Sequence, residues 1–368
     1  MKVIRRMVYA ESLQAVGFVT LGFVALFFFL DFVEELPDIG TGPRQQGYQV
    51  LHALLFVTLM VPSHLYDLLP ITVLIGTIFV MARLAQTSEF TILRTSGLGP
   101  WRALRTLLSL GAAFALLTFA VGDYLAPWAD RTGQLLKSQY RGAITIGQTG
   151  AWIKERQGDH DFTVNVAALS PRGEGLGVRV FEFNPRGELL SQLRAERARF
   201  TDADGWMLDN VQRLRFGDGT PNAPMVQETL QSLRWSTGIS AEMVSVALLK
   251  PQRMGTLDLF AYIRHLDANG QSAQRYSIEF WRKVFYPLSC IVMVILALPF
   301  AYLHFRSGTI ATFVFAGVLL GISFFLLNNV FGYVGTLRNW EPWITAASPS
   351  LIYTLVSLGA FGWLVLKR

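Results

Sequence analysis

A short polar stretch between two long apolar runs has the residues of a small docking helix. Thr87 or Ser88 can cap the free amides of its first turn, and the carboxylate of Glu89 has the sign that a helix N-terminus favours. Residues that cannot easily continue a helix follow, namely Gly97, Gly99 and Pro100. The pattern therefore predicts a short helix over about residues 86–97.

One side of this predicted helix is apolar. Phe90 and Leu93 share a face at helical spacing, which leaves Glu89 and Arg94 toward solvent or a partner. Two interpretations fit the pattern: a tight interfacial elbow between two transmembrane helices, or a coupling helix that docks onto a cytoplasmic motor. The spacing by itself leaves both open.

A second group of candidate residues lies at the start of a later apolar run. It combines cations with aromatic rings: Arg275, Tyr276, Trp281, Arg282 and Lys283. Long cationic side chains at a helix end can simply reach the membrane interface. The same groups can also line a cavity and pair with the phosphates of an anionic lipid.

The sequence lacks common catalytic motifs. It has no Gly-x-x-x-x-Gly-Lys-Ser/Thr loop, because the one lysine followed by a hydroxyl residue, Lys137, is preceded by Leu136. Its histidines form no His-Glu-x-x-His pair, no Gly-x-Ser-x-Gly elbow occurs, and the lone Cys290 cannot form a disulfide within the chain. We therefore expect no catalytic residues, and no metal or cofactor bound by this chain.

The composition is that of an α-helical polytopic membrane protein. Of the 368 residues, 52% are hydrophobic and only 16% are charged. Six apolar runs are long enough to cross a bilayer, at residues 13–32, about 65–82, 103–121, 284–303, 310–331 and 344–366. The second run begins earlier, at Leu51, and Pro62 and Pro70 predict a break that separates an outer interfacial segment from the true span.

Residues from about 124 to 276 are polar and alternate in character. Strand patterns at residues 162–166, 178–183 and 206–208 are separated by turn signals such as Asn184-Pro185-Arg186-Gly187. They predict an antiparallel all-β sandwich or jelly roll, followed by a helix over 257–266. We therefore divide the chain into transmembrane helices 1–3 (1–123), a β-jelly-roll domain (124–276) and transmembrane helices 4–6 (277–368).

The distribution of basic residues predicts the orientation. Six spans place both termini on one side of the membrane, and most flanking cations fall on that side: Lys2, Arg5, Arg6, Arg83, Arg94, Arg102, Arg105, Arg306, Lys367 and Arg368. Arg44 and Arg338 lie in the two short loops opposite. Because cytoplasmic loops carry the excess of Lys and Arg, the termini are predicted to be cytoplasmic and the β domain to be outside.

Four segments in combination carry a family resemblance. They are Leu84-Ala85-Gln86-Thr87-Ser88-Glu89, Gly122-Asp123-Tyr124-Leu125-Ala126-Pro127, Ser272-Ala273-Gln274-Arg275-Tyr276 and Phe280-Trp281-Arg282-Lys283-Val284-Phe285-Tyr286-Pro287-Leu288-Ser289. With three spans, a β domain and three spans in that order, the chain resembles the lipopolysaccharide-export permeases of Gram-negative bacteria, the LptF/LptG family. Leu-Ala-Gln-x-Ser-Glu and Phe-Tyr-Pro-Leu-Ser make it more similar to the LptG members than to the LptF members.

The resemblance implies a transport subunit of the inner membrane with its β domain in the periplasm. It implies an LptF-like second permease at its side, an LptB-like ATPase dimer that holds ATP and Mg, and the bridge proteins LptC and LptA. By the same analogy Glu89 would contact the ATPase, with Phe90 and Leu93 packing into its groove. The first and fifth spans would form lateral gates through which lipopolysaccharide enters. A permease for lipoproteins or another lipid, and a scaffold without transport, are the alternatives.

A lipid with several acyl chains and phosphates needs an apolar wall and a basic rim. Phe27, Phe28, Phe324 and Phe325 are candidates for the wall, although any lipid-facing helix carries such residues. Arg282 and Lys283 are candidates for the rim.

The outer end of the first span departs from the family. Relatives carry lysines there, whereas this chain has acids: Asp31, Glu34, Glu35 and Asp38. Arg44 can substitute for those lysines, divalent cations can bridge the acids to the lipid, or Arg282 and Lys283 can carry the contact instead.

Overall fold

The computed structural model describes most of the chain, namely residues 2–40, 48–87, 89, 92, 100–141, 150–170, 173–201, 205–216, 225–241, 243–244, 251–302 and 310–366. Contacts divide the chain into two compact units. The first unit comprises Met1–Val33, Met60–Ala129 and Gln274–Arg368. The second comprises Glu34–Leu59 and Asp130–Ala273.

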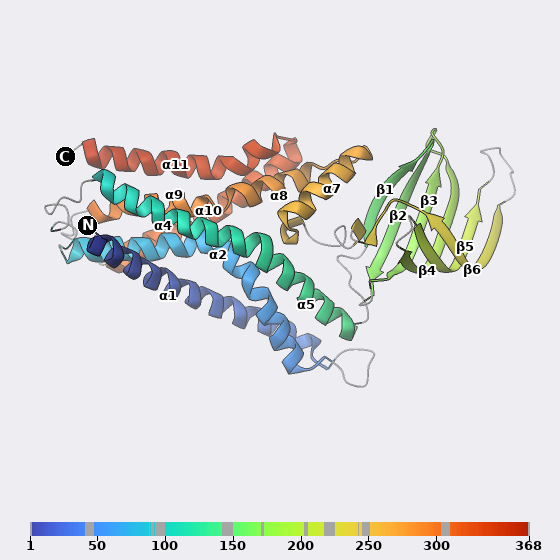
Figure 1. The fold of residues 1–368 in the computed structure, drawn as a ribbon, viewed down its shortest axis with the longest axis horizontal. Helices are drawn as coiled ribbons and strands as arrows, with labels where there is room; N and C mark the ends of the chain where they lie inside the picture. The colour runs from blue at the N-terminus through green and yellow to red at the C-terminus, as the bar shows by residue number, and fades with distance from the viewer. Residues whose placement is uncertain are drawn as a thin grey trace. The chain divides into compact units, whose positions relative to one another are not determined.

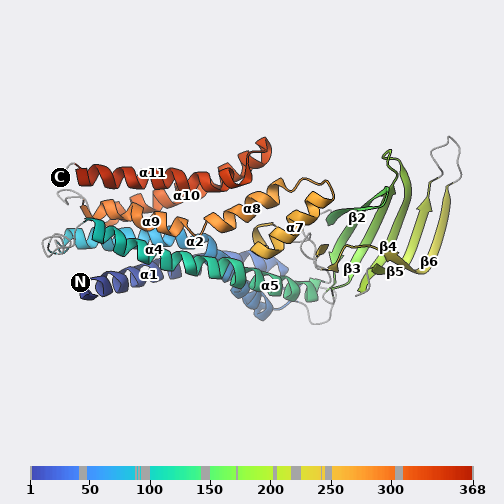
Figure 2. The same cartoon turned by 45° about the horizontal axis from the view of Figure 1, so that its top comes forward.

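Long apolar helices build the first unit. Five of the described helices are long and apolar enough to cross a membrane: α1 (Lys2–Glu35), α2 (Val50–Gln86), the helix that begins as α4 (Pro100–Ala120) and continues to Lys137, α10 (Ile310–Arg338) and α11 (Pro342–Leu366). A bent pair, α8 (Gln274–Phe285) with α9 (Ser289–Ala297) and its extension η4 (Leu298–Tyr302), turns by 48° and makes up to six. Figures 1 and 2 both show the start of α1 and the end of α11 at the same end of the bundle. A polytopic helical architecture is confirmed.

The predicted break at the prolines of the second span is wrong. Helix α2 runs unbroken through Pro62 and Pro70. A proline removes one helical hydrogen bond, but a helix packed among neighbours tolerates this loss. The most apolar stretch of α2 is 83% buried within the protein, which supplies that packing.

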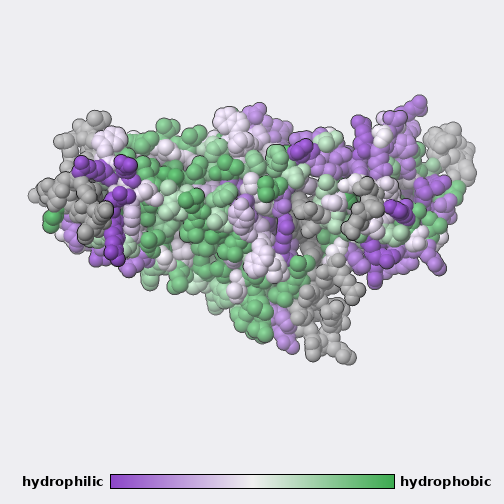
Figure 3. All heavy atoms as spheres, viewed as in Figure 1, coloured by the Kyte–Doolittle hydropathy of each residue, from purple (hydrophilic) through white to green (hydrophobic). Residues whose placement is uncertain are grey.

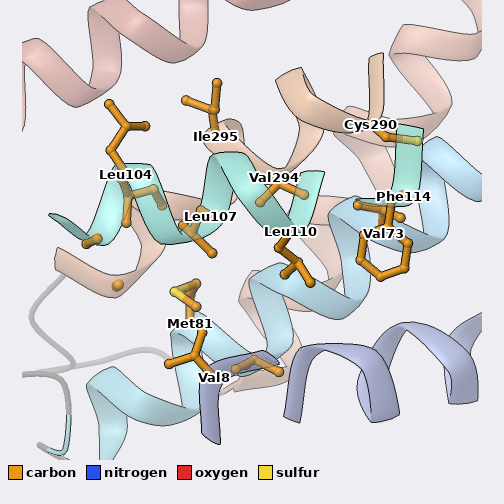
Figure 4. Close-up of a cluster of buried hydrophobic side chains, with 14 of the residues drawn as sticks. Val8, Val73, Met81, Leu104, Leu107, Leu110, Phe114, Cys290, Val294 and Ile295 are labelled. Atoms are coloured by element: carbon orange, nitrogen blue, oxygen red, sulfur yellow. The ribbon is translucent and has the colours of Figure 1, made fainter. Parts of the chain in front are cut away.

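The core of the helical unit joins segments that are far apart in sequence (Figure 4). Leu107 and Leu110 of α4 lie in one cluster with Met81 of α2 and with Val294 of α9. Gly111 explains the close approach of α4 to α9, because a Cβ there would lie 2.9 Å from the Cα of Ile291. In membranes, small residues of this kind let helix backbones approach.

The second unit contains one antiparallel sheet of six described strands in chain order: β1 (Ala151–Gln157), β2 (His160–Leu169), β3 (Gly175–Phe183), β4 (Leu189–Thr201), β5 (Gly205–Arg215) and β6 (Val226–Ser236). Strand β3 buries alternate residues, Val178 and Val180, and the paired strand β2 buries Val164 and Val166 together with Asn165 between them. The predicted antiparallel β domain is therefore confirmed. The described strands form a meander, and the jelly roll is not confirmed.

Local signals of the β domain are confirmed as well. The Asn184 side-chain carbonyl accepts hydrogen bonds from the backbone N–H groups of Arg186 and Glu188, both at 2.9 Å, and Gly187 has a φ of 79°. This is the turn that the sequence predicts, because an Asx side chain and a glycine meet its needs. The predicted helix at 257–266 is α7 (Thr256–Ala268).

Short irregular helical turns occur on both connections between the apolar helices and the strands. A π-helical turn, η2 (Val121–Leu125), follows α4 directly and leads into α5 (Ala126–Arg141). A short 3-10 turn, η3 (Pro251–Arg253), precedes α7. Space-filling atoms are mostly apolar over the membrane-type helices and mostly hydrophilic over the strands (Figure 3), as each unit's expected surroundings require.

Candidate functional site

The structure describes four residues of the predicted coupling stretch: Gln86, Thr87, Glu89 and Ile92. Glu89 is helical and half-buried, and Ile92 is helical and 62% exposed. Three of the predicted contact residues, Phe90, Leu93 and Arg94, lie outside the described residues.

Thr87 directly follows α2 and bonds back to it. Its backbone N–H and its hydroxyl both donate to the carbonyl of Arg83, each at 3.0 Å. A hydroxyl that bonds back to residue i−4 completes the helix it follows. The other predicted cap, Ser88, lies outside the described residues, so the cap by Thr87 or Ser88 stays a prediction.

Arg282 and Lys283 do not form one basic rim, because neighbouring residues of a helix point in different directions. The Arg282 guanidinium, with 20% of its side chain exposed, donates to Glu279 at 3.0 Å and to the side chain of Asn329 on α10 at 3.3 Å. Lys283 is only 7% exposed, and its ammonium donates to the carbonyl of Gly122 at 2.9 Å.

The four phenylalanines predicted to form an apolar wall also differ in exposure and in the residues they contact. Phe324 is 1% exposed and contacts the ring of Tyr353 edge-on, with centroids 5.2 Å apart. Phe325, the next residue, is 42% exposed. On α1, Phe28 is half-buried and Phe27 stacks on His64 at 5.0 Å. The four phenyl groups therefore do not line a common surface of this chain.

Residues of other helices pair with the acids at the C-terminal end of α1. Asp31 Oδ2 lies 2.5 Å from Nε2 of His64 on α2. Glu35 is 7% exposed and accepts hydrogen bonds from Lys137 of α5 at 2.5 Å and from the Tyr48 hydroxyl at 3.2 Å.

Lys137 is the central cation of this cluster. Its ammonium also lies 3.1 Å from Asp38 and 4.7 Å from the ring centroid of Phe56. Sequence reasoning missed Lys137 and His64, and the unexplained acids were the signal that cations must lie nearby. Glu34 is exposed, and Arg44 falls outside the described residues.

The described residues hold no group of three or more His, Cys, Asp or Glu side chains placed to bind a metal ion.

Two spans leave their apolar flanks uncovered by the rest of the chain. In the most apolar stretch of α1 only 6% of residues are buried, and in that of α10 only 17%. One exposed stripe follows α10 at spacings of three and four residues: Phe315, Leu319, Ile322, Leu326, Val330, Tyr333 and Leu337. A stripe of this kind faces lipid or another membrane protein.

Comparisons with known proteins agree along the chain. A family model described as "Lipopolysaccharide export system permease LptF/LptG" matches residues 6–366. The chain is 28% identical over 348 residues to the lipopolysaccharide export system permease protein LptG of Escherichia coli K12, covering 94% of this chain and 92% of that protein. It is 24% identical over 349 residues to the LptG protein of Haemophilus influenzae, with the same coverage of each chain.

Proposed function

We propose that this chain extracts lipopolysaccharide from the outer leaflet of the inner membrane. The premise is that the chain belongs to the LptF/LptG family and is a lipopolysaccharide export permease. The observation that carries this proposal is the pair of uncovered flanks on α1 and α10. A lipid that leaves the bilayer sideways must pass between helices whose apolar sides face outward. Helices sealed inside a bundle, such as α2, cannot offer that route.

The proposed topology has six spans, with the bent pair α8 and α9 counted as one. Both termini would be cytoplasmic, and the β domain would lie in the periplasm, in agreement with the charge distribution. We retain the domain division at residues 1–123, 124–276 and 277–368, with the β domain as part of a jelly-roll bridge. The chain would thus be a multi-pass protein of the inner membrane.

The proposed assembly supplies what this chain lacks. An LptF-like permease would cover part of the exposed flanks, and an LptB-like ATPase dimer would hold ATP and Mg. LptC and LptA would receive the lipid from the β domain. Hydrolysis would then occur on the partner, and this chain would convert it into movement of its helices.

Among the lipid-contact candidates, we propose Arg282 for a lipid phosphate and Phe28 and Phe325 for acyl chains, because each is at least partly exposed. The Arg282 guanidinium, which now donates to Glu279, could donate to a lipid phosphate instead by a change of its side chain alone. Arg44 is a further candidate from the sequence. Phe27 stacks on His64 and Phe324 is buried, so we propose that these two rings pack within the protein and do not touch the lipid.

Glu89 offers the first test, because it begins the predicted coupling helix. In a complex purified with its ATPase, Glu89→Lys is expected to lower lipopolysaccharide-stimulated ATP hydrolysis about tenfold, which corresponds to ~1.4 kcal/mol of lost interaction. Glu188→Lys, the same charge change on an exposed turn of the β domain, is the matched control and should hydrolyse ATP at the wild-type rate. Equal stimulation in both variants would refute the coupling role.

A further inference from the structure

A buried cation inside the helical unit has no part in the function described so far. Lys283 of α8 keeps its ammonium away from solvent and donates to the main-chain carbonyl of Gly122. Its ammonium also lies 5.8 Å from the ring centroid of Tyr66 on α2. A buried charge within a membrane-spanning region is costly, so the presence of Lys283 here points to a specific task.

The π-helical turn η2 is built to receive this ammonium. It widens the helix by one residue, with the N–H of Ala126 bonded to the carbonyl of Val121. Gly122 within the turn admits Tyr66, since a Cβ at this position would lie 2.2 Å from two ring carbons. Such π-helical insertions are frequent at functional positions in helices.

The end of α8 is fixed at a second point, one turn later. The Tyr286 hydroxyl donates to the carbonyl of Asp67 on α2 at 2.5 Å, and the rings of Tyr286 and Tyr66 are 5.1 Å apart. Tyr286 stands just before the 48° bend between α8 and α9. The contacts of Lys283 and Tyr286 therefore hold the part of α8 that meets the bend.

Gly122 and Lys283 lie on the two passages that connect the membrane helices to the sheet. The outgoing passage runs from η2 through α5 toward β1, and the returning passage runs from α7 into α8. The hydrogen bond between Lys283 and Gly122 ties the two passages together within the helical unit.

The second unit has its own tie between the same passages. Arg131 of α5 pairs with Asp258 of α7, and Arg253 of η3 lies 3.9 Å from Asp130 of α5. Two independent sets of contacts, one in each unit, thus join the outgoing passage to the returning one. If the two passages transmit movement of the helices to the β domain as one rigid connection, contacts of this kind must hold them together. Two flexible linkers would not need such contacts.

We infer that Lys283 is a positioning residue that makes the two passages move as one when the membrane helices rearrange, and that it does not contact the lipid. This inference rests on the proposed function, because a mechanical connection matters only if the helices and the β domain work together. Arg282, which faces α10, keeps the lipid role proposed above.

The test uses the full complex with its ATPase in proteoliposomes. Two quantities are measured: lipopolysaccharide bound per complex, by crosslinking, and lipopolysaccharide delivered to a soluble acceptor per ATP hydrolysed. Lys283→Met keeps the length of the side chain but removes its charge and donor. It should lower delivery per ATP at least fivefold with lipid binding retained. Lys283→Arg, which keeps a donor, should recover more than half of the wild-type ratio.

Arg282→Met is the matched control at the neighbouring position and should lower lipid binding instead. If Lys283→Met fails to fold, Arg131→Met in the other tie carries the test and should lower the same ratio about twofold. Unchanged delivery per ATP in the folded variant, or a parallel loss of bound lipid, would overturn the inference. A wild-type complex that delivers no lipopolysaccharide would overturn the proposed function, and the inference with it.

Discussion

Helices α1 and α2 are similar in length and hydrophobicity but opposite in how much of each is buried. They have 34 and 37 residues, and both are apolar enough to span a membrane. Yet 6% of the most apolar stretch of α1 is buried, against 83% of that of α2. Hydrophobicity therefore identifies a span without indicating what surrounds it, because lipid tails and protein side chains are equally apolar neighbours.

Glycines mark the difference between the two helices. A Cβ on Gly76 of α2 would lie 2.7 Å from the backbone N of Val16, and Cβ atoms on Gly317 and Gly321 of α10 would each meet an isoleucine of α2 at 2.8 Å. Among the described residues, no atom lies within 4 Å of a Cβ built on Gly17 or Gly22 of α1. α2 is thus packed through close backbone approaches, whereas α1 leaves a side free for lipid or a partner.

The largest effect is expected where α10 meets α2. Phe324 belongs to a buried cluster with Leu74 and Ile78, so Phe324→Ala should lower the free energy of unfolding by about 3 kcal/mol. That is the low end for such a change, because lipid replaces water outside the protein. Phe325→Ala removes the same ring from the exposed side and should cost less than 1 kcal/mol. The free energies of unfolding are measured by unfolding the purified variants in detergent. Equal losses for Phe324→Ala and Phe325→Ala would contradict the predicted difference between the buried and the exposed ring.

Gly76 tests the contact between α1 and α2 with an intermediate effect. Gly76→Val places its Cβ against the backbone of Val16, which cannot move aside as a flexible side chain would. Overpacking of this kind should cost about 2 kcal/mol and lower the thermal midpoint of the purified chain. Gly17→Val, on the open side of α1, should leave that midpoint unchanged.

A fall in midpoint for Gly17→Val that occurs only in the assembled complex would show a partner packed against that side of α1.

The smallest effect concerns the polar contact between the same helices. The Thr20 hydroxyl donates to the hydroxyl of Thr72 at 2.9 Å. Thr20→Val keeps the shape but removes the donor, and it should cost about 0.6 kcal/mol, the average for hydrogen bonds between membrane helices. A double-mutant cycle with Thr72→Val measures the coupling directly, and a value near zero would mean that this contact does not hold α1.

Local patterns allowed much of the fold to be predicted. The apolar runs became helices and the alternating segments became strands, since both periodicities are properties of a few neighbouring residues. The break predicted at Pro62 and Pro70 failed because packing around α2 outweighs the local effect of proline. The meander order of the strands depends on pairings between separate segments, so no single strand pattern contains it.

The candidate site was predictable only in its residue types. Sequence reasoning selected Arg282 and Lys283 as one pair, although their side chains bond to different helices. It also marked the acids at the end of α1 as a departure from the family, and two of them, Glu35 and Asp38, pair with Lys137, which lies 102 positions beyond Glu35. Contacts between distant segments leave no spacing signal in one sequence.

The sequence by itself determined the class of the protein, the presence of apolar helices and of an antiparallel β domain, its family, and the absence of common catalytic motifs, because these depend on composition and on short patterns. Only the tertiary structure decided which spans are buried, which of two adjacent cations points inward, and which cation neutralises which acid. These outcomes depend on the space between helices, where one glycine permits contact and one side-chain direction separates Lys283 from Arg282.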